Sequence, residues 1–285
     1  HHTHIDRSGR KDWWHNNEKV HEEGYVTNLI TEHSVKFIED NRDRPFCLYV
    51  AHEAPHYPYQ GPGDKAGRKE GATKFVQQGT RKDRDAAYKE MIEVMDEGSG
   101  RIFATLKRLN LAENTFVFFF SDNGGTGPGS NGPLRGRKGS LWEGGIRVPA
   151  MAWWPGRIGP NQVCEEAAIS IDIFPTIMKL GGGELPEDRR LDGVDLAPLL
   201  FDGGKLEPRD IFWAYRKQRA VRRGPWKLTV NVSGQDRTTT LFHLEEDLEE
   251  STNIAEQHPD RVKAMQQVLE AWEKDVMGPQ IQKQD

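Results

Sequence analysis

Residues 115–120, of which all but Thr115 are apolar, constrain the fold of this chain more than any other segment. A strand that is apolar on both faces is expected at the centre of a sheet covered by helices on both sides. Apolar residues at three-to-four spacing predict helices over 27–40 and 86–109. A short apolar run after a proline predicts a buried strand over 46–51. Strands alternating with helices indicate an α/β fold, a mixed sheet sandwiched by helices.

The second half of the chain predicts a change of architecture. A strand is expected over 148–154 and a helix over 170–180, and the Gly-, Pro- and Asp-rich stretch 181–208 is typical of a linker. We therefore expect a larger α/β domain over residues 1–204 and a small C-terminal antiparallel sheet plus helix over 205–285. The segments expected to form that sheet are 211–215, 219–222, 226–232 and 239–244, followed by a helix over 259–276.

Composition excludes several classes of protein. No window approaches 18 consecutive apolar residues, so no membrane-spanning helix is expected. The net charge of -5 argues against a nucleic-acid binder, which needs a basic surface. The two cysteines, Cys47 and Cys164, are too few for a disulfide scaffold or a multi-cysteine metal site. Composition does not indicate an oligomeric state.

Asp122 and Asn123 follow directly after the central strand. Ligand sites of open α/β sheets lie at the carboxyl ends of the strands. Carboxylate and amide oxygens there would suit Ca²⁺ or Mg²⁺ better than softer metals. The alternative is an ordinary turn, which the Asn-Gly pair favours. Taken alone, these residues favour the turn over a metal site.

Two further segments contain candidate residues. His56 lies between two prolines in the loop 51–58, and a histidine exchanges protons near neutral pH, which suits proton transfer or anion binding. Lys138 lies in the Gly-rich segment 134–145, where cations would complement an oxyanion. The alternatives are a surface histidine and a solvated basic loop.

An ordered set of short motifs extends along nearly the whole chain. It comprises His56-Tyr57-Pro58, Ser121-Asp122-Asn123-Gly124, Gly136-Arg137-Lys138-Gly139, Trp142-Glu143-Gly144-Gly145, and residues 147–150, 154–156, 172–176 and 241–244 with Asp247, Glu250 and Asn253. In this order the motifs resemble the formylglycine-dependent sulfatases of the alkaline phosphatase superfamily, close to arylsulfatase A and N-acetylgalactosamine-6-sulfatase. The resemblance implies an alkaline phosphatase-like α/β fold and hydrolysis of a sulfated sugar or an aryl sulfate.

The resemblance also implies roles for individual residues. Asp122 and Asn123 would supply half of a Ca²⁺ site. Lys138 would bind the sulfate group, and His56 would bind either the sulfate or the oxygen of the departing alcohol. Members of this family usually work outside the cytoplasm, which implies a secreted, periplasmic or lysosome-like location.

Two features of the family are missing from this sequence. The formylglycine nucleophile arises in a Cys/Ser-x-Pro-x-Arg signature, and neither Cys47, Cys164 nor any serine fits it. The paired N-terminal aspartates that complete the metal site are also absent. We therefore expect this chain to be the C-terminal two-thirds of a sulfatase, holding half of a divided active site and inactive alone.

Two other functions remain open. A phosphodiesterase or phosphonate hydrolase of the same superfamily would share Asp122 and Asn123 but would not be expected to carry the Lys138 segment in this form. The other is a non-catalytic relic that binds sulfated glycans, which would be supported if the upstream sequence also lacked the Cys/Ser-x-Pro-x-Arg signature; its presence there would support the enzyme.

Overall fold

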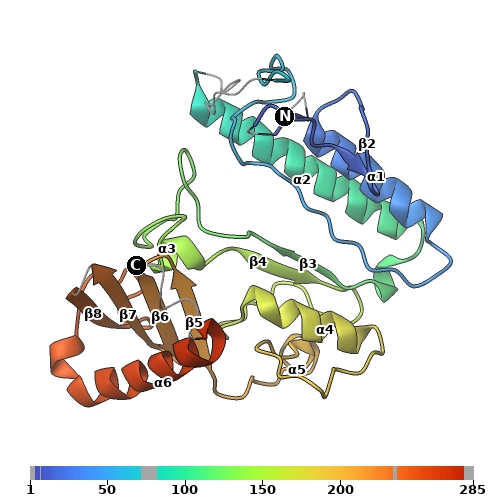
Figure 1. The fold of residues 1–285 in the computed structure, drawn as a ribbon. Helices are drawn as coiled ribbons and strands as arrows, with labels where there is room; N and C mark the ends of the chain where they lie inside the picture. Colours follow the sequence, from blue (N-terminus) through green and yellow to red (C-terminus); the bar gives the residue numbers. More distant parts are fainter. Residues whose placement is uncertain (1–3, 7, 72–81, 234–235, 279–285) are drawn as a thin grey trace. The chain divides into compact units, whose positions relative to one another are not determined.

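The structure, a computed structural model, describes residues 4–6, 8–71, 82–233 and 236–278 (Figure 1). The chain divides into two compact units. The first unit contains residues 1–116 with 154–156, and the second contains residues 117–153 with 157–285. The predicted division into domains at residue 204 stays a prediction.

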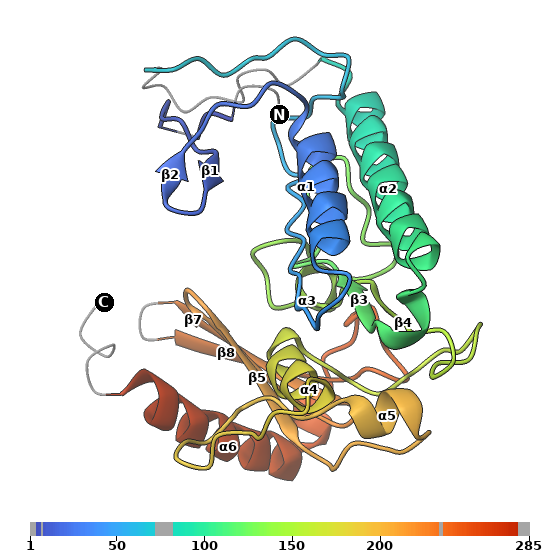
Figure 2. The same ribbon diagram turned by 90° about the vertical axis from the view of Figure 1, so that its right-hand side faces the viewer.

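Two long helices dominate the first unit. Helix α1 (Val26–Asp40) and helix α2 (Arg84–Arg108) lie side by side (Figures 1 and 2) and confirm the two predicted helices. Smaller elements are the hairpin of β1 (Trp14–His15) and β2 (Glu18–Lys19) and the 3-10 helix η1 (Ala112–Asn114). No helix among the described residues is long and apolar enough to cross a membrane.

The two helices approach each other closely at Gly98. A Cβ atom at this position would lie 2.3 Å from Oγ1 of Thr31 on α1. Thr31 is buried, and its hydroxyl donates a hydrogen bond of 2.9 Å to the carbonyl of Thr27. Glycine at position 98 therefore lets α2 pack against α1 without displacing this side chain. Gly100, two residues further along α2, is exposed and has nothing within 4 Å of its Cβ position.

The predicted strand over residues 46–51 is wrong. No strand forms there, the side chain of Tyr49 is 82% exposed, and Cys47 is exposed as well. A strand needs a neighbour to accept and donate its backbone hydrogen bonds. Among the described residues no segment pairs with this one, so its apolar composition alone does not make it a strand.

The second unit begins with the strand predicted over 115–120, but among the described residues this strand has a single neighbour and is not the centre of a sheet. Strand β3 (Val117–Phe120) pairs antiparallel with β4 (Ala150–Trp153), in a register that places Phe120 opposite Ala150. The connection between them contains the short helix α3 (Glu143–Ile146). The predicted helix over 170–180 is present as the 3-10 turn η2 (Ser170–Asp172) and helix α4 (Ile173–Leu180). The predicted linker contains a short helix, α5 (Ala197–Phe201), that its composition did not indicate.

The C-terminal sheet is present as predicted. Four antiparallel strands follow in chain order, and helix α6 (Pro259–Met277) lies along the sheet (Figure 1). Met265 and Leu269 of α6 are buried against Leu228 and Leu241, which joins the helix to the sheet through an apolar core. A 3-10 turn, η3 (Ala255–Gln257), precedes α6. The strands are β5 (Asp210–Tyr215), β6 (Gln218–Arg223), β7 (Trp226–Ser233) and β8 (Asp236–His243).

The packing of α1 against α2 gives the first testable prediction. Gly98→Ala should lower the free energy of unfolding by about 1–3 kcal/mol, because the new methyl group overpacks against Thr31. Gly100→Ala is the matched control and should raise the free energy of unfolding by about 1 kcal/mol, the usual gain from alanine in a helix. Urea denaturation of both variants checks the prediction, and a stabilising Gly98→Ala would contradict the close approach.

Candidate functional site

Asp122 and Asn123 lie just beyond the end of β3, where the sequence predicted a ligand site. Asn123 Nδ2 donates a hydrogen bond of 2.5 Å to Asp122 Oδ2, so the two side chains lie side by side. Ser121 Oγ donates to the carbonyl of Asn123 at 3.0 Å and helps to fix this turn. Asp122 is exposed and Asn123 is half-buried, so an ion from solvent can reach them. Rotation of the amide would present the oxygen of Asn123 on the same side as the carboxylate.

The donor type of this pair fits Ca²⁺. Ca²⁺ prefers carboxylate and amide oxygens and takes about six to eight of them. Within the described part of the chain, no group of three or more His, Cys, Asp or Glu side chains is arranged to hold a metal. Asp122 and Asn123 can therefore supply part of a Ca²⁺ site, which needs further oxygen ligands to be complete.

The backbone around Lys138 folds back onto the turn that carries Asp122. The amide of Lys138 donates to the carbonyl of Gly125 at 3.3 Å, and the amide of Gly124 donates to the carbonyl of Gly145 at 3.0 Å. The Lys138 side chain is exposed. One folded segment thus holds both the proposed metal ligands and the proposed sulfate ligand.

His56 lies in the first unit, whereas the other three candidates lie in the second. Its ring stacks on that of Tyr57, with centroids 4.6 Å apart, and its Nδ1 lies 2.9 Å from the Tyr57 carbonyl. Because a carbonyl oxygen only accepts hydrogen bonds, Nδ1 of His56 carries a proton in this contact. If the ring takes up a second proton, on Nε2, that nitrogen can donate as well. That His56 shares one site with Lys138 stays a prediction.

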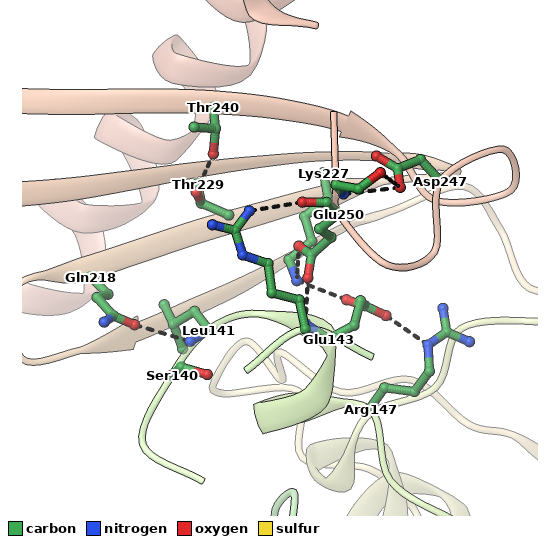
Figure 3. Close-up of polar contacts among 12 residues, drawn as sticks. Ser140, Leu141, Glu143, Arg147, Gln218, Lys227, Thr229, Thr240, Asp247 and Glu250 are labelled. Carbon is green, nitrogen blue, oxygen red and sulfur yellow. Dashed lines mark hydrogen bonds and ion pairs between the residues drawn. The ribbon is translucent and has the colours of Figure 1, made fainter. Parts of the chain in front are cut away.

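The sequence did not reveal a buried ion cluster made by Glu143, Lys227 and Glu250 (Figure 3). Lys227 Nζ lies 2.8 Å from Glu143 Oε1 and 2.8 Å from Glu250 Oε1. Glu250 Oε2 accepts a hydrogen bond of 2.6 Å from the amide of Glu143, and Arg147 Nε donates to Glu143 Oε2 at 2.7 Å. A charged residue between two apolar ones, as in Trp226-Lys227-Leu228, is the only sequence signal for it.

The two carboxylates of this cluster respond differently to burial. Burial alone would raise the pKa of Glu143, but the attraction of Lys227 and the hydrogen bonds from Lys227 and Arg147 bring it below its usual value. Burial raises the pKa of Glu250, and Lys227 offsets only part of that effect. Glu143 pairs with two cations, Lys227 and Arg147, and its charged form is favoured for that reason.

Comparison with known proteins decides the family. Residues 2–183 match the sulfatase family, and residues 137–275 match the C-terminal region of N-sulphoglucosamine sulphohydrolase. The chain belongs to the sulfatase family. The resemblance drawn from the motifs is thereby confirmed.

Sulfatases are also the relatives found in individual comparisons. The chain is 36% identical to mouse steryl-sulfatase over 202 residues, which cover 67% of this chain and 30% of that protein. It is 34% identical to mouse N-acetylgalactosamine-6-sulfatase over 213 residues, which cover 72% of this chain and 38% of that protein. The chain thus spans only about a third of the length of these curated relatives.

A solved structure confirms the fold. The structure of Ps i-CgsB in complex with k-i-k-neocarrahexaose matches with a TM-score of 0.78 and 28% identity, over 91% of this chain and 57% of that one. The present chain therefore has an alkaline phosphatase-like α/β fold, with a small C-terminal antiparallel sheet and helix.

The Asp122–Asn123 pair gives the second testable prediction. Because the pair supplies only some of the ligands that Ca²⁺ requires, this chain should bind Ca²⁺ with a dissociation constant of about 1 mM or weaker. Backbone amide shifts of residues 121–125 during a Ca²⁺ titration measure it. Asp122→Asn should abolish these shifts, and Asp188→Asn, at an exposed carboxylate paired with Arg189, should leave them unchanged. Micromolar binding that survives Asp122→Asn would contradict the assignment.

Proposed function

We propose that this chain forms the part of a sulfuric ester hydrolase active site that contains Asp122, Asn123, Lys138 and His56. The supporting observation is that the backbone of Lys138 hydrogen-bonds to Gly125, next to the turn that carries the Asp122–Asn123 pair, in a chain of the sulfatase family. The family's formylglycine nucleophile requires a Cys/Ser-x-Pro-x-Arg signature that this sequence lacks. The complete site would therefore include a second segment of protein.

Each of the four residues has a role that its chemistry allows. Asp122 and Asn123 would hold Ca²⁺, which supplies positive charge toward the sulfuryl oxygens when bound. The ammonium of Lys138 would offset negative charge on the same oxygens as it grows in the transition state. His56, protonated and oriented through its Nδ1 contact with Tyr57, would donate a proton from Nε2 to the departing alcohol oxygen.

The substrate that we propose is a sulfate ester of a sugar, with an aryl sulfate as the simpler chromogenic equivalent. Relatives of this chain are named as steryl and N-acetylgalactosamine-6 sulfatases, and one solved relative contains k-i-k-neocarrahexaose. A sugar alkoxide is a poor leaving group, so a proton donor such as His56 would matter for this substrate class. We further propose a location outside the cytoplasm, as in a secreted, periplasmic or lysosomal enzyme.

Lys138→Ala is the first test of this proposal. The assay uses this chain joined to a segment that carries the Cys/Ser-x-Pro-x-Arg signature and produced with the formylglycine-generating enzyme. Turnover of a sulfate ester should fall at least about a hundredfold, the usual loss for one oxyanion-stabilising donor. Lys205→Ala, at an exposed lysine of the same unit, is the control and should keep full turnover.

Three outcomes would contradict the proposal. Unchanged turnover in Lys138→Ala would mean that Lys138 is not part of the active site. Metal-dependent sulfate release by this chain alone would exclude a divided site. Binding of a sulfated oligosaccharide without turnover by the joined protein would favour the non-catalytic relic.

His56→Ala tests the proton donor separately. Turnover of an alkyl or sugar sulfate should fall more than turnover of nitrophenyl sulfate, because nitrophenolate leaves readily without a proton. His15→Ala, at an exposed histidine of the same unit, serves as the control and should affect neither substrate. Equal losses on both substrates would mean that His56 binds the sulfate and does not protonate the leaving group.

A further inference from the structure

We propose that the buried ion cluster of Glu143, Lys227 and Glu250 acts as a set of positioning residues that hold Lys138 in place beside Asp122 and Asn123. The inference rests on the proposed function of Lys138. It assigns to the C-terminal sheet a role in the reaction, although none of the three residues is placed to touch substrate.

Helix α3 is the part of the second unit on which both candidate segments rest. A Cβ atom at Gly144 would lie 2.6 Å from the carbonyl oxygens of Arg135 and Gly136, and one at Gly124 would lie 1.9 Å from the carbonyl oxygen of Gly144. The segment that leads to Lys138 and the turn that carries Asp122 therefore pack directly on the backbone of α3. The amide of Gly144 also donates to the carbonyl of Arg135 at 2.8 Å. A displacement of α3 would move both segments.

The ion cluster fixes α3 to the C-terminal sheet. Glu143 is the first residue of α3, Lys227 lies in β7, and Glu250 lies in the turn after β8 (Figure 3). Their side chains are 3%, 0% and 0% exposed, respectively. Figure 3 shows Lys227 and Glu250 directed toward Glu143 from the sheet side, with Arg147 on the opposite side of Glu143. The position of α3 is thus set by residues more than 80 positions away in sequence.

Two further contacts join the Lys138 segment to the same sheet. Arg135 Nη1 donates to the carbonyl of Glu250 at 2.8 Å, and the guanidinium carbon of Arg135 lies 3.9 Å from the centroid of the Trp142 ring. The amide of Leu141 donates to Gln218 Oε1 at 3.0 Å. The segment around Lys138 is therefore held on both sides by polar contacts that end on the C-terminal strands or on the turn after them.

The charges of Lys227, Glu143 and Glu250 restrict how α3 can lie against the C-terminal sheet. A buried ammonium is stable only where carboxylates surround it, and removal of one partner leaves an uncompensated charge out of water. Lys227 therefore requires Glu143 and Glu250 to stay within reach, whereas an apolar contact would tolerate sliding. A catalytic lysine needs such a fixed frame, because a misplacement of about 1 Å can cost about a hundredfold in rate.

Amide hydrogen exchange in this chain tests the positioning role independently of activity. In Glu143→Gln, and in the double variant Lys227→Met/Glu143→Gln, exchange of the Gly124 and Gly144 amides should accelerate at least about tenfold relative to the amides of α6. Dividing the exchange rates of these two amides by those of the α6 amides corrects for any general loss of stability. Asp172→Asn is the matched control, because it neutralises a fully buried carboxylate paired with Arg209 at 2.6 Å. It should leave the ratio unchanged.

Kinetics of the joined protein form the second arm. Glu143→Gln should lower kcat at least about tenfold and change KM less than threefold, because Lys138 acts on charge that develops in the transition state. Asp172→Asn should leave kcat within twofold. Unaltered exchange at Gly124 and Gly144 in both cluster variants, or equal kinetic losses in Glu143→Gln and Asp172→Asn, would overturn the positioning role. If Lys138→Ala keeps full turnover, the proposed function fails, and the exchange arm still decides whether the cluster holds the segment.

Discussion

The ammonium group of Lys227 is fully buried, and the arrangement of the second unit depends on how its charge is compensated. A buried charge must be paired, so β7, the first residue of α3 and the turn after β8 are brought to one point. The connection between β3 and β4 contains many glycines and few large apolar side chains, and hydrophobic packing alone would hold it weakly. Ionic and polar contacts to the C-terminal sheet therefore hold it together with the packing of Trp142 against Phe242 of β8.

This constraint connects stability to the candidate site. Glycines 124 and 144 allow the turn of Asp122 and the segment of Lys138 to rest on α3, and Glu143 fixes α3 to the sheet. The small C-terminal sheet thus does more than extend the fold. Its strand β7 and the turn after β8 define where a lysine of the preceding segment lies relative to two oxygen donors.

Local patterns predicted much of this structure from the sequence. Helices α1, α2, α4 and α6 follow from apolar periodicity, and the four C-terminal strands follow from short strand-like segments separated by turn residues. The strand predicted over 46–51 is absent because a strand depends on a partner, and no local pattern shows whether a partner exists. Helix α5 was missed because it is short and has a proline in its first turn, and prolines are also typical of linkers.

In the candidate site, too, contacts between neighbouring residues could be predicted from the sequence, and contacts between distant residues could not. That Asp122 and Asn123 lie just after a strand could be predicted from neighbouring residues, and the structure places their side chains side by side. The pairing of Glu143 with Lys227, 84 residues apart, could not be predicted, because nothing in either segment identifies the other. The roles that we propose for Lys138 and His56 rest on membership of the sulfatase family and on the chemistry of their side chains.

The most direct test of the central claim, a divided sulfatase site, is a crystal structure of this chain joined to a segment with the Cys/Ser-x-Pro-x-Arg signature, grown with Ca²⁺ and sulfate. The account predicts Ca²⁺ on the side-chain oxygens of Asp122 and Asn123. It also predicts a sulfate ion within hydrogen-bond distance of both Lys138 Nζ and His56 Nε2. A sulfate ion bound away from both residues, or Ca²⁺ bound without Asp122, would contradict it.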